Sequence, residues 1–172
     1  YKVTLEYTKA VYEGAPLCPS VVVKSSTKAS AVTLVQGVDY TVEYVNNDAP
    51  GTASVIIRGI NAYVGSITKT FTVNPAQVTG LEITQVTHNS VTVCFDPVPG
   101  ATEYWIYQGS TRKAKIEDTT YTFTGLTIGT TYNFSVKANT NVNGVDYTGA
   151  ASQTISARPS SSIESYTLTL SG

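Results

Sequence analysis

The chain has 172 residues, which allows one large domain or two small ones. Eleven Lys and Arg against twelve Asp and Glu leave a net charge of −1 with no basic block, which disfavours non-specific nucleic-acid binding. The sequence contains no run of about 18 apolar residues, so we expect no membrane-spanning segment in it. Thr, Val, Ser and Tyr are abundant and strong helix formers are sparse, so the composition predicts an all-β fold.

Residues 1–73 read as short strands separated by turn residues. Pairs and triplets of apolar residues recur with a period of two, which is typical of half-buried strands. Lys69 interrupts one of these series, and we expect it to lie at a frayed end, to extend its ammonium to solvent or to mark a bulge. The alternating sets are Val3, Leu5 and Tyr7; Tyr40, Val42 and Tyr44; Ala53, Val55 and Ile57; and Ile67, Phe71 and Val73.

This first segment resembles a family of small bacterial Ig-like domains that occur in tandem on surface proteins of Gram-positive bacteria. The similarity lies in Y-E-G-A-P-L-C-P (12–19), G-V-D-Y-T-V-E-Y-V-N-N (37–47) and the long stretch from Gly51 to Val73. The resemblance implies a β-sandwich in a secreted or wall-attached protein, without a catalytic residue. The chain starts at Tyr1 within a strand-like pattern, so we also expect it to be a piece of a longer polypeptide.

Asn74-Pro75-Ala76 breaks the strand pattern, because proline lacks an amide donor and restricts the residue before it. We therefore expect an Ig-like domain over 1–74, a short linker over 75–78 and a second domain over 79–159. A linker of this length should be semi-rigid.

The second segment repeats the β pattern with turns about every 8–12 residues, as in an Ig-like sandwich. Asn143-Gly144 is a strong signal for a two-residue hairpin turn. The stretch 126–138, L-T-I-G-T-T-Y-N-F-S-V-K-A, combines a turn with an alternating strand. Its Leu126, Gly129 and Tyr132 suit a corner in which the tyrosine hydroxyl is anchored to the turn backbone.

These residues resemble a fibronectin type III domain over about 80 positions. The motifs are V-T-G-L (78–81), S-V-T-V-C-F-D-P-V (90–98), G-A-T-E-Y-W-I-Y (100–107) and the stretch 126–138. Phe95 stands where the family usually carries a core Trp, and we expect it to fill the same core position. The resemblance implies a second all-β module, so the predicted fold is two tandem Ig-like β-sandwiches.

The tail after Pro159 contains three serines and then I-E-S-Y-T-L-T-L-S-G. Because Tyr166, Leu168 and Leu170 alternate, we expect residues 160–172 to form a linker and the first strand of a further domain. A disordered tail is the alternative.

Catalytic and metal sites are not expected. The single histidine, His88, lies in a turn without a catalytic partner at suitable spacing. Cys18 and Cys94 are too few for a disulfide framework and too far apart for a metal site, so we expect two free thiols and no cofactor.

The best candidates for a binding surface are Trp105 and Tyr107. If Tyr104 and Ile106 point inward, these two rings point outward, on a sheet that also presents Asn133, Ser135 and Lys137. Such rings beside hydrogen-bonding groups can stack on sugars or anchor a protein. The alternative is structural: a neighbouring strand, a charged side chain or the other module covers the rings.

We therefore expect a non-catalytic, weakly adhesive spacer in a secreted or cell-surface bacterial protein, located outside the cell, at its surface or at the cell wall. The alternatives are a recognition module that uses the Trp105 and Tyr107 face, together with Asn133 and Lys137, and accessory domains of a secreted glycoside hydrolase. The expected partners are carbohydrate, a host or surface protein, and neighbouring domains of the same chain.

Overall fold

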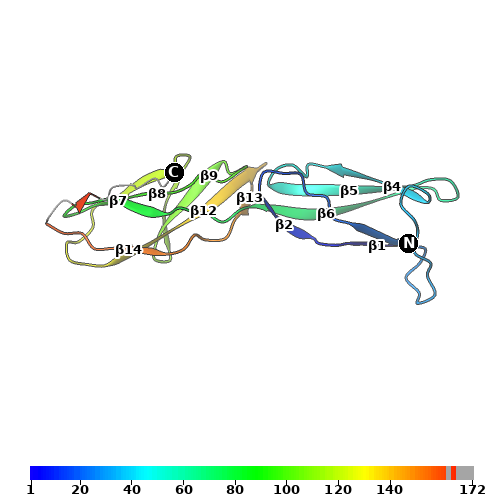
Figure 1. The fold of residues 1–172 in the computed structure, drawn as a ribbon, viewed down its shortest axis with the longest axis horizontal. Helices are drawn as coiled ribbons and strands as arrows, with labels where there is room; N and C mark the ends of the chain where they lie inside the picture. Colours follow the sequence, from blue (N-terminus) through cyan, green and yellow to red (C-terminus); the bar gives the residue numbers. More distant parts are fainter. Residues whose placement is uncertain (162–163, 166–172) are drawn as a thin grey trace, which may run out of the picture. The chain divides into compact units, whose positions relative to one another are not determined.

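A computed structural model describes residues 1–161 and 164–165. The chain divides into two compact units, Tyr1–Asn74 and Pro75–Gly172. Within the described ranges every regular element is a β-strand, which confirms the all-β prediction (Figure 1). The described residues contain no helix that is long and apolar enough to cross a membrane.

The first unit consists of two antiparallel sheets. One pairs β1 with β3, and the other has the order β2-β6-β5-β4. The strands are β1 (Lys2–Leu5), β2 (Lys9–Tyr12), β3 (Val21–Lys24), β4 (Tyr40–Val45), β5 (Gly51–Gly59) and β6 (Ser66–Pro75).

The first core follows the predicted alternation. Ala53, Val55 and Ile57 of β5 are buried beside Phe71 and Val73 of β6. The hydroxyl of Tyr40 donates to the Val21 carbonyl at 3.2 Å and that of Tyr44 to the Pro19 carbonyl at 2.7 Å, so polar atoms at the core edge are satisfied.

Lys69 shares the strand parity of Phe71 and is nevertheless exposed. It pairs with Val55 in an unbroken register between β5 and β6, so no bulge accounts for it. Its ammonium avoids the cost of burial by remaining in solvent.

The second unit is a sandwich of two sheets. One has the order β11-β8-β7-β15; the other has the order β10-β9-β12-β13, with β14 also paired to β12. The strands are β7 (Glu82–Val86), β8 (Val91–Cys94), β9 (Glu103–Gln108), β10 (Thr111–Ile116), β11 (Thr120–Phe123), β12 (Tyr132–Val142), β13 (Val145–Thr148), β14 (Ile155–Ala157) and β15 (Glu164–Ser165).

The second core joins these two sheets. Phe123 of β11 and Phe134 of β12 lie with their ring centres 4.1 Å apart. Phe95 is 5% exposed and packs edge-on against Tyr104 at 4.9 Å, so an aromatic ring fills the core at this position. Buried Val136 and Ala138 continue the alternation of β12.

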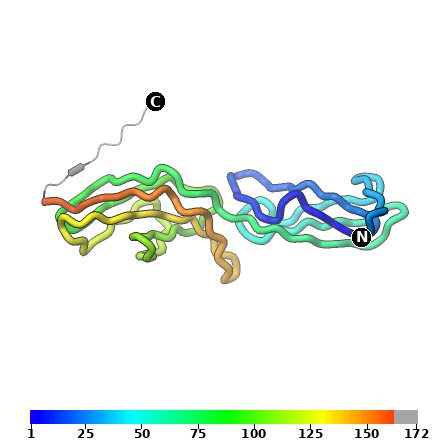
Figure 2. Tube along the Cα trace, turned by 90° about the horizontal axis from the view of Figure 1, so that it is seen from below, coloured from blue at the N-terminus to red at the C-terminus, as the bar shows by residue number. Residues whose placement is uncertain are grey.

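The β12–β13 hairpin closes through Asn143 and Gly144, whose φ angles are +51° and +85°. Two successive positive φ angles are what a two-residue hairpin turn requires, so the sequence signal at these residues is confirmed. The tip of this hairpin projects from the body of its unit (Figure 2, gold).

The predicted linker and the tail lie at the two ends of the second unit. In the expected linker, Pro75 is the last residue of β6, while Val78 is buried in the second core. In the tail, Glu164 and Ser165 pair with Val86 and Gln85 of β7. The expected strand at Tyr166–Leu170 lies outside the described residues.

Candidate functional site

The outer surface of β10, β9 and β12 gathers the predicted aromatic residues and several cations. Cross-strand register places Trp105 between Lys115 and Lys137, and Tyr107 between Arg112 and Ser135. We call Trp105, Tyr107, Arg112, Lys115 and Lys137 the cation–aromatic face. Tyr104 and Ile106, which alternate with the two rings, are buried at 4% and 0% exposure.

Trp105 is half-buried and fixed in place by charged neighbours. The guanidinium carbon of Arg112 lies 4.6 Å from its ring centre, and Nζ of Lys115 lies 5.2 Å from it. The indole Nε1 donates a hydrogen bond of 2.6 Å to the Glu103 carboxylate. The ring is therefore oriented by one acid and covered in part by two cations.

Glu103 is the centre of a polar network on the same surface, next to Trp105. Its carboxylate also accepts a bond of 2.8 Å from the Asn139 amide and pairs with Lys115 at 3.3 Å. The hydrogen bond from Trp105 is the largest of the effects that hold the pKa of Glu103 below its ordinary value, with further contributions from Asn139 and Lys115. Glu103 thus remains ionised and keeps the indole in one orientation.

Tyr107 is half-buried, and Nζ of Lys137 lies 5.5 Å from its ring centre. Asn133 lies on β12 farther from the two rings, and its side-chain oxygen accepts a hydrogen bond of 2.6 Å from the Ser156 hydroxyl. The structure therefore brings Trp105, Tyr107 and Lys137 together and leaves Asn133 apart, at the β14 edge.

Sequence reasoning missed Arg112 and Lys115, because strict alternation puts residues three apart on opposite faces. A register shift between Arg112 and Ala114 inserts Lys113 as an extra residue, so Arg112 and Lys115 both lie on the outer surface. In an unbroken strand Arg112 would point to the same inner side as Ala114 and Ile116. A charged arginine at an inward position of the alternation is therefore a sequence signal of a bulge.

The residues predicted to have structural roles form a corner at the start of β12. The hydroxyl of Tyr132 accepts a hydrogen bond of 3.0 Å from the Thr127 amide. Hydrogen bonds from Thr127 lower the pKa of Tyr132. Leu126 is buried, and Gly129, at φ +77°, donates its amide to the Pro159 carbonyl at 2.9 Å.

Reactive side chains are scattered. His88 is exposed in its turn, Cys18 is an exposed thiol, and the half-buried Cys94 thiol lies 3.4 Å from the Glu82 carboxylate. Across residues 1–161 and 164–165, no group of three His, Cys, Asp or Glu side chains could hold a metal ion.

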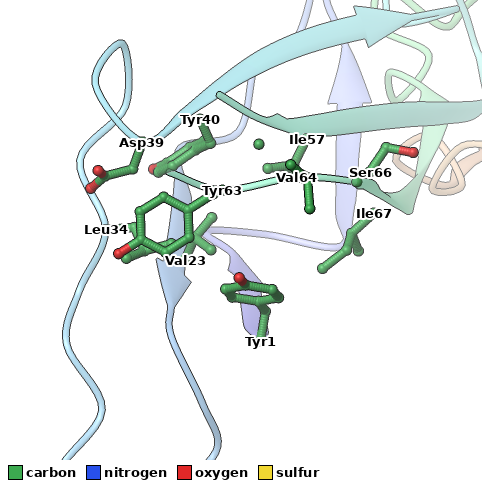
Figure 3. Close-up of a pocket in the computed structure, with 12 residues that line it drawn as sticks. Tyr1, Val23, Leu34, Asp39, Tyr40, Ile57, Tyr63, Val64, Ser66 and Ile67 are labelled. Carbon is green, nitrogen blue, oxygen red and sulfur yellow. The ribbon is translucent and has the colours of Figure 1, made fainter. Parts of the chain in front are cut away.

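A cavity of about 160 Å³ lies in the first unit (Figure 3). Most of its lining is apolar, and the rings of Tyr1 and Tyr63 meet edge-on at 6.1 Å. The carboxylate of Asp39 at its border accepts the Val35 amide at 2.7 Å, and Tyr40 donates to a carbonyl. These polar groups are used by the fold itself, so they form no catalytic arrangement.

Known proteins resemble the chain over most of its length. It is 32% identical to chitinase A1 of Niallia circulans over 152 residues, which are 86% of this chain and 21% of that protein. It is 29% identical to exoglucanase B of Cellulomonas fimi over 146 residues, which are 82% of this chain and 13% of that protein. The chain thus spans about a fifth or less of the length of these relatives.

The chain also aligns with solved domains. The fibronectin type III domain of human fibronectin type III domain containing protein 3 aligns with a TM-score of 0.43 and 18% identity, covering 51% of this chain and 87% of that one. The Fibronectin type III domain family matches residues 76–158. The second unit therefore contains a fibronectin type III domain, which is a non-catalytic module.

Proposed function

We propose that this chain is a non-catalytic accessory segment of a secreted bacterial polysaccharide-degrading enzyme. The observation that carries the proposal is the pattern of similarity to the chitinase and the exoglucanase. The matches cover 86% and 82% of this chain but only 21% and 13% of the two enzymes. A segment shared in this way serves as a spacer that separates a catalytic domain from other parts of the protein.

The first unit fits the same role as a bacterial Ig-like domain. Its core of β-branched and aromatic residues and its long β5–β6 ladder form a unit that resists unfolding. Together, 1–74 and 79–159 are two Ig-like modules in tandem, and an extracellular or wall-attached location suits them.

The parent enzyme provides the test of the spacer role. The segment is replaced by a Gly/Ser linker of equal length, and hydrolysis of a soluble oligosaccharide is compared with hydrolysis of the insoluble polymer. We expect unchanged activity on the soluble substrate and reduced activity on the polymer, because a flexible linker does not maintain domain spacing. Activity on the polymer that is unchanged by the replacement would contradict the spacer role.

A second candidate function is recognition through the cation–aromatic face. The observation that favours it is the Trp105 indole, which Glu103 orients and which remains half-exposed beside Tyr107. A preoriented ring loses little freedom when a ligand stacks on it. Replacement of Trp105 by Ala should then abolish glycan retention by the isolated chain, and unchanged retention would remove this candidate.

A further inference from the structure

The positive charge of the second unit is concentrated on one sheet. Residues 75–161 contain five Lys and Arg, namely Arg112, Lys113, Lys115, Lys137 and Arg158. Four of them lie on β10 or β12, and only Arg158 lies elsewhere. This segregation is notable because the whole chain has a net charge of −1.

Four of these five cations form no ion pair in the described residues, and two of the four, Arg112 and Lys137, belong to the cation–aromatic face. Within the described residues, the ion pairs are Arg58 with Glu43 and Lys115 with Glu103. Arg112 and Lys137 instead lie on the rings of Trp105 and Tyr107. A cation on an aromatic ring keeps its full charge and can still pair with an anion from solution.

The face therefore offers two aromatic rings and two unpaired cations, arranged in adjacent rows. The first row is Arg112, Tyr107 and Ser135; the second is Lys115, Trp105 and Lys137. Rows on one side of a strand are about 7 Å apart, and β10 and β12 are about 10 Å apart across β9. This spacing suits an extended chain that lies along the sheet.

We propose that the cation–aromatic face binds a polysaccharide of uronic acid residues. This inference rests on the proposed recognition role of the face and specifies its ligand class. A uronate ring carries a carboxylate, and it has an apolar C–H surface that packs on the part of Trp105 or Tyr107 that the cations leave exposed. The planar guanidinium of Arg112 matches a carboxylate through two parallel hydrogen bonds, and Lys137 supplies a second point charge.

The face also carries features that disfavour nucleic acid. Glu103 lies within the face, and Asp146 lies near it. Hydrogen bonds from Asn141 and Asn139 are the main causes that lower the pKa of Asp146, and the charges of Lys115 and Arg112 lower it further. A phosphate backbone binds tightly only through many cation contacts, and the face offers two unpaired cations beside these two acids. Two unpaired cations therefore disfavour a ligand that binds by charge alone.

Affinity electrophoresis of the whole chain tests the proposal, with polygalacturonate as the anionic probe and soluble hydroxyethyl cellulose as the neutral one. Trp105 is the single tryptophan, so its fluorescence reports ligand at the face directly. We expect retardation by polygalacturonate, a change in Trp105 emission and weaker binding at higher salt. The double substitution Arg112→Gln with Lys137→Gln should weaken binding by about tenfold.

Two further variants control for charge. Lys9→Gln with Lys69→Gln changes two exposed lysines of the first unit and has the same net charge as the test variant, so it should bind like the unchanged chain. Arg112→Lys with Lys137→Arg preserves both charges but moves the planar guanidinium away from position 112, so it should bind more weakly than the unchanged chain and more tightly than the test variant. Equal loss in the Lys9/Lys69 control would overturn the proposal.

The remaining outcomes separate the inference from the recognition role. Retention by the neutral polymer, lost on Trp105→Ala and independent of salt, would keep recognition and overturn the uronate specificity. Equal affinity for a single-stranded oligonucleotide would overturn the glycan assignment. Absence of binding to every probe would overturn both and leave the spacer role intact.

Discussion

The guanidinium of Arg112 lies 4.6 Å from the centre of the Trp105 ring, on a neighbouring strand of the same sheet. This contact depends on the bulge at Lys113, which places Arg112 on the outer surface. It also means that the chain's single tryptophan reports both the folding of the second unit and the state of its charged face.

Replacement of Arg112 by Ala should destabilise the second unit by about 0.5–1 kcal/mol, because a cation–π contact near solvent contributes roughly that much. Urea unfolding followed by Trp105 fluorescence measures the change without interference from the first unit. Lys113→Ala is the matched control, since Lys113 is the exposed extra residue of the same bulge. An equal loss in both variants would show that the contact with the ring contributes nothing specific.

Glu103 should make the stability of the second unit sensitive to acid. Its folded-state pKa lies below the ordinary value of 4.5, so the unfolded chain binds its proton more tightly than the folded protein does. The stabilisation is therefore present above about pH 4.5 and lost as the pH falls through the folded-state pKa. Glu103→Gln should be less stable than the unchanged protein at pH 7, and the difference should shrink at pH 3.

Urea midpoints at pH 7 and pH 3 measure this difference through Trp105 fluorescence. Glu117→Gln is the matched control, because Glu117 is an exposed glutamate of the same unit with no ion pair in the described residues, and its variant should keep the stability of the unchanged protein. A difference between Glu103→Gln and the unchanged protein that stays constant with pH would contradict the role assigned to the Glu103 carboxylate.

Tyr132→Phe should lower the urea midpoint of the second unit, because it removes the acceptor of the Thr127 amide at the corner before β12. Tyr121→Phe is the matched control: Tyr121 packs on Phe123 at 4.9 Å, and no hydrogen bond of its hydroxyl is seen in the described residues. Its midpoint should change less. A larger effect at Tyr121 would show that the corner bond is not a main stabilising feature.

Much of the fold follows from local patterns. The alternation of Phe134, Val136 and Ala138 determines which side of β12 is buried, and Asn143-Gly144 determines where its hairpin turns. These features depend on neighbours in sequence, so the sequence predicts them. The outward direction of Trp105 and Tyr107 follows from the same alternation.

The charged part of the candidate site could not be predicted in this way. The position of Arg112 depends on a bulge, and one extra residue reverses the side of every residue before it. The bond from Trp105 to Glu103 joins residues two apart on one face of β9, but its geometry depends on Asn139 and Lys115 from the neighbouring strands. Such convergence needs the register of three strands, which the sequence alone does not provide.

Gly149→Ala should destabilise the second unit by about 1–3 kcal/mol, the usual cost of overpacking. A Cβ at this buried position would lie 2.6 Å from the Pro75 carbonyl oxygen and 2.7 Å from that of Ala76. Gly144→Ala is the matched control, because a Cβ there meets no atom within 4 Å and costs only about 1 kcal/mol of left-handed backbone strain. Urea unfolding measures both, and a smaller loss at Gly149 would mean that the segment at Pro75 and Ala76 moves aside readily.

The two thiols should react at different rates with a disulfide reagent under native conditions. Cys18 is exposed, whereas Cys94 is half-buried and lies beside Glu82. Burial is the largest of the effects that raise the pKa of Cys94, and the reactive thiolate is therefore scarcer at this residue. Absorbance of the released thiolate at pH 8 should show one fast and one slow phase, and denaturant should merge them. Cys18→Ser should remove the fast phase and Cys94→Ser the slow one; a total of less than two thiols after unfolding without reductant would instead reveal a disulfide.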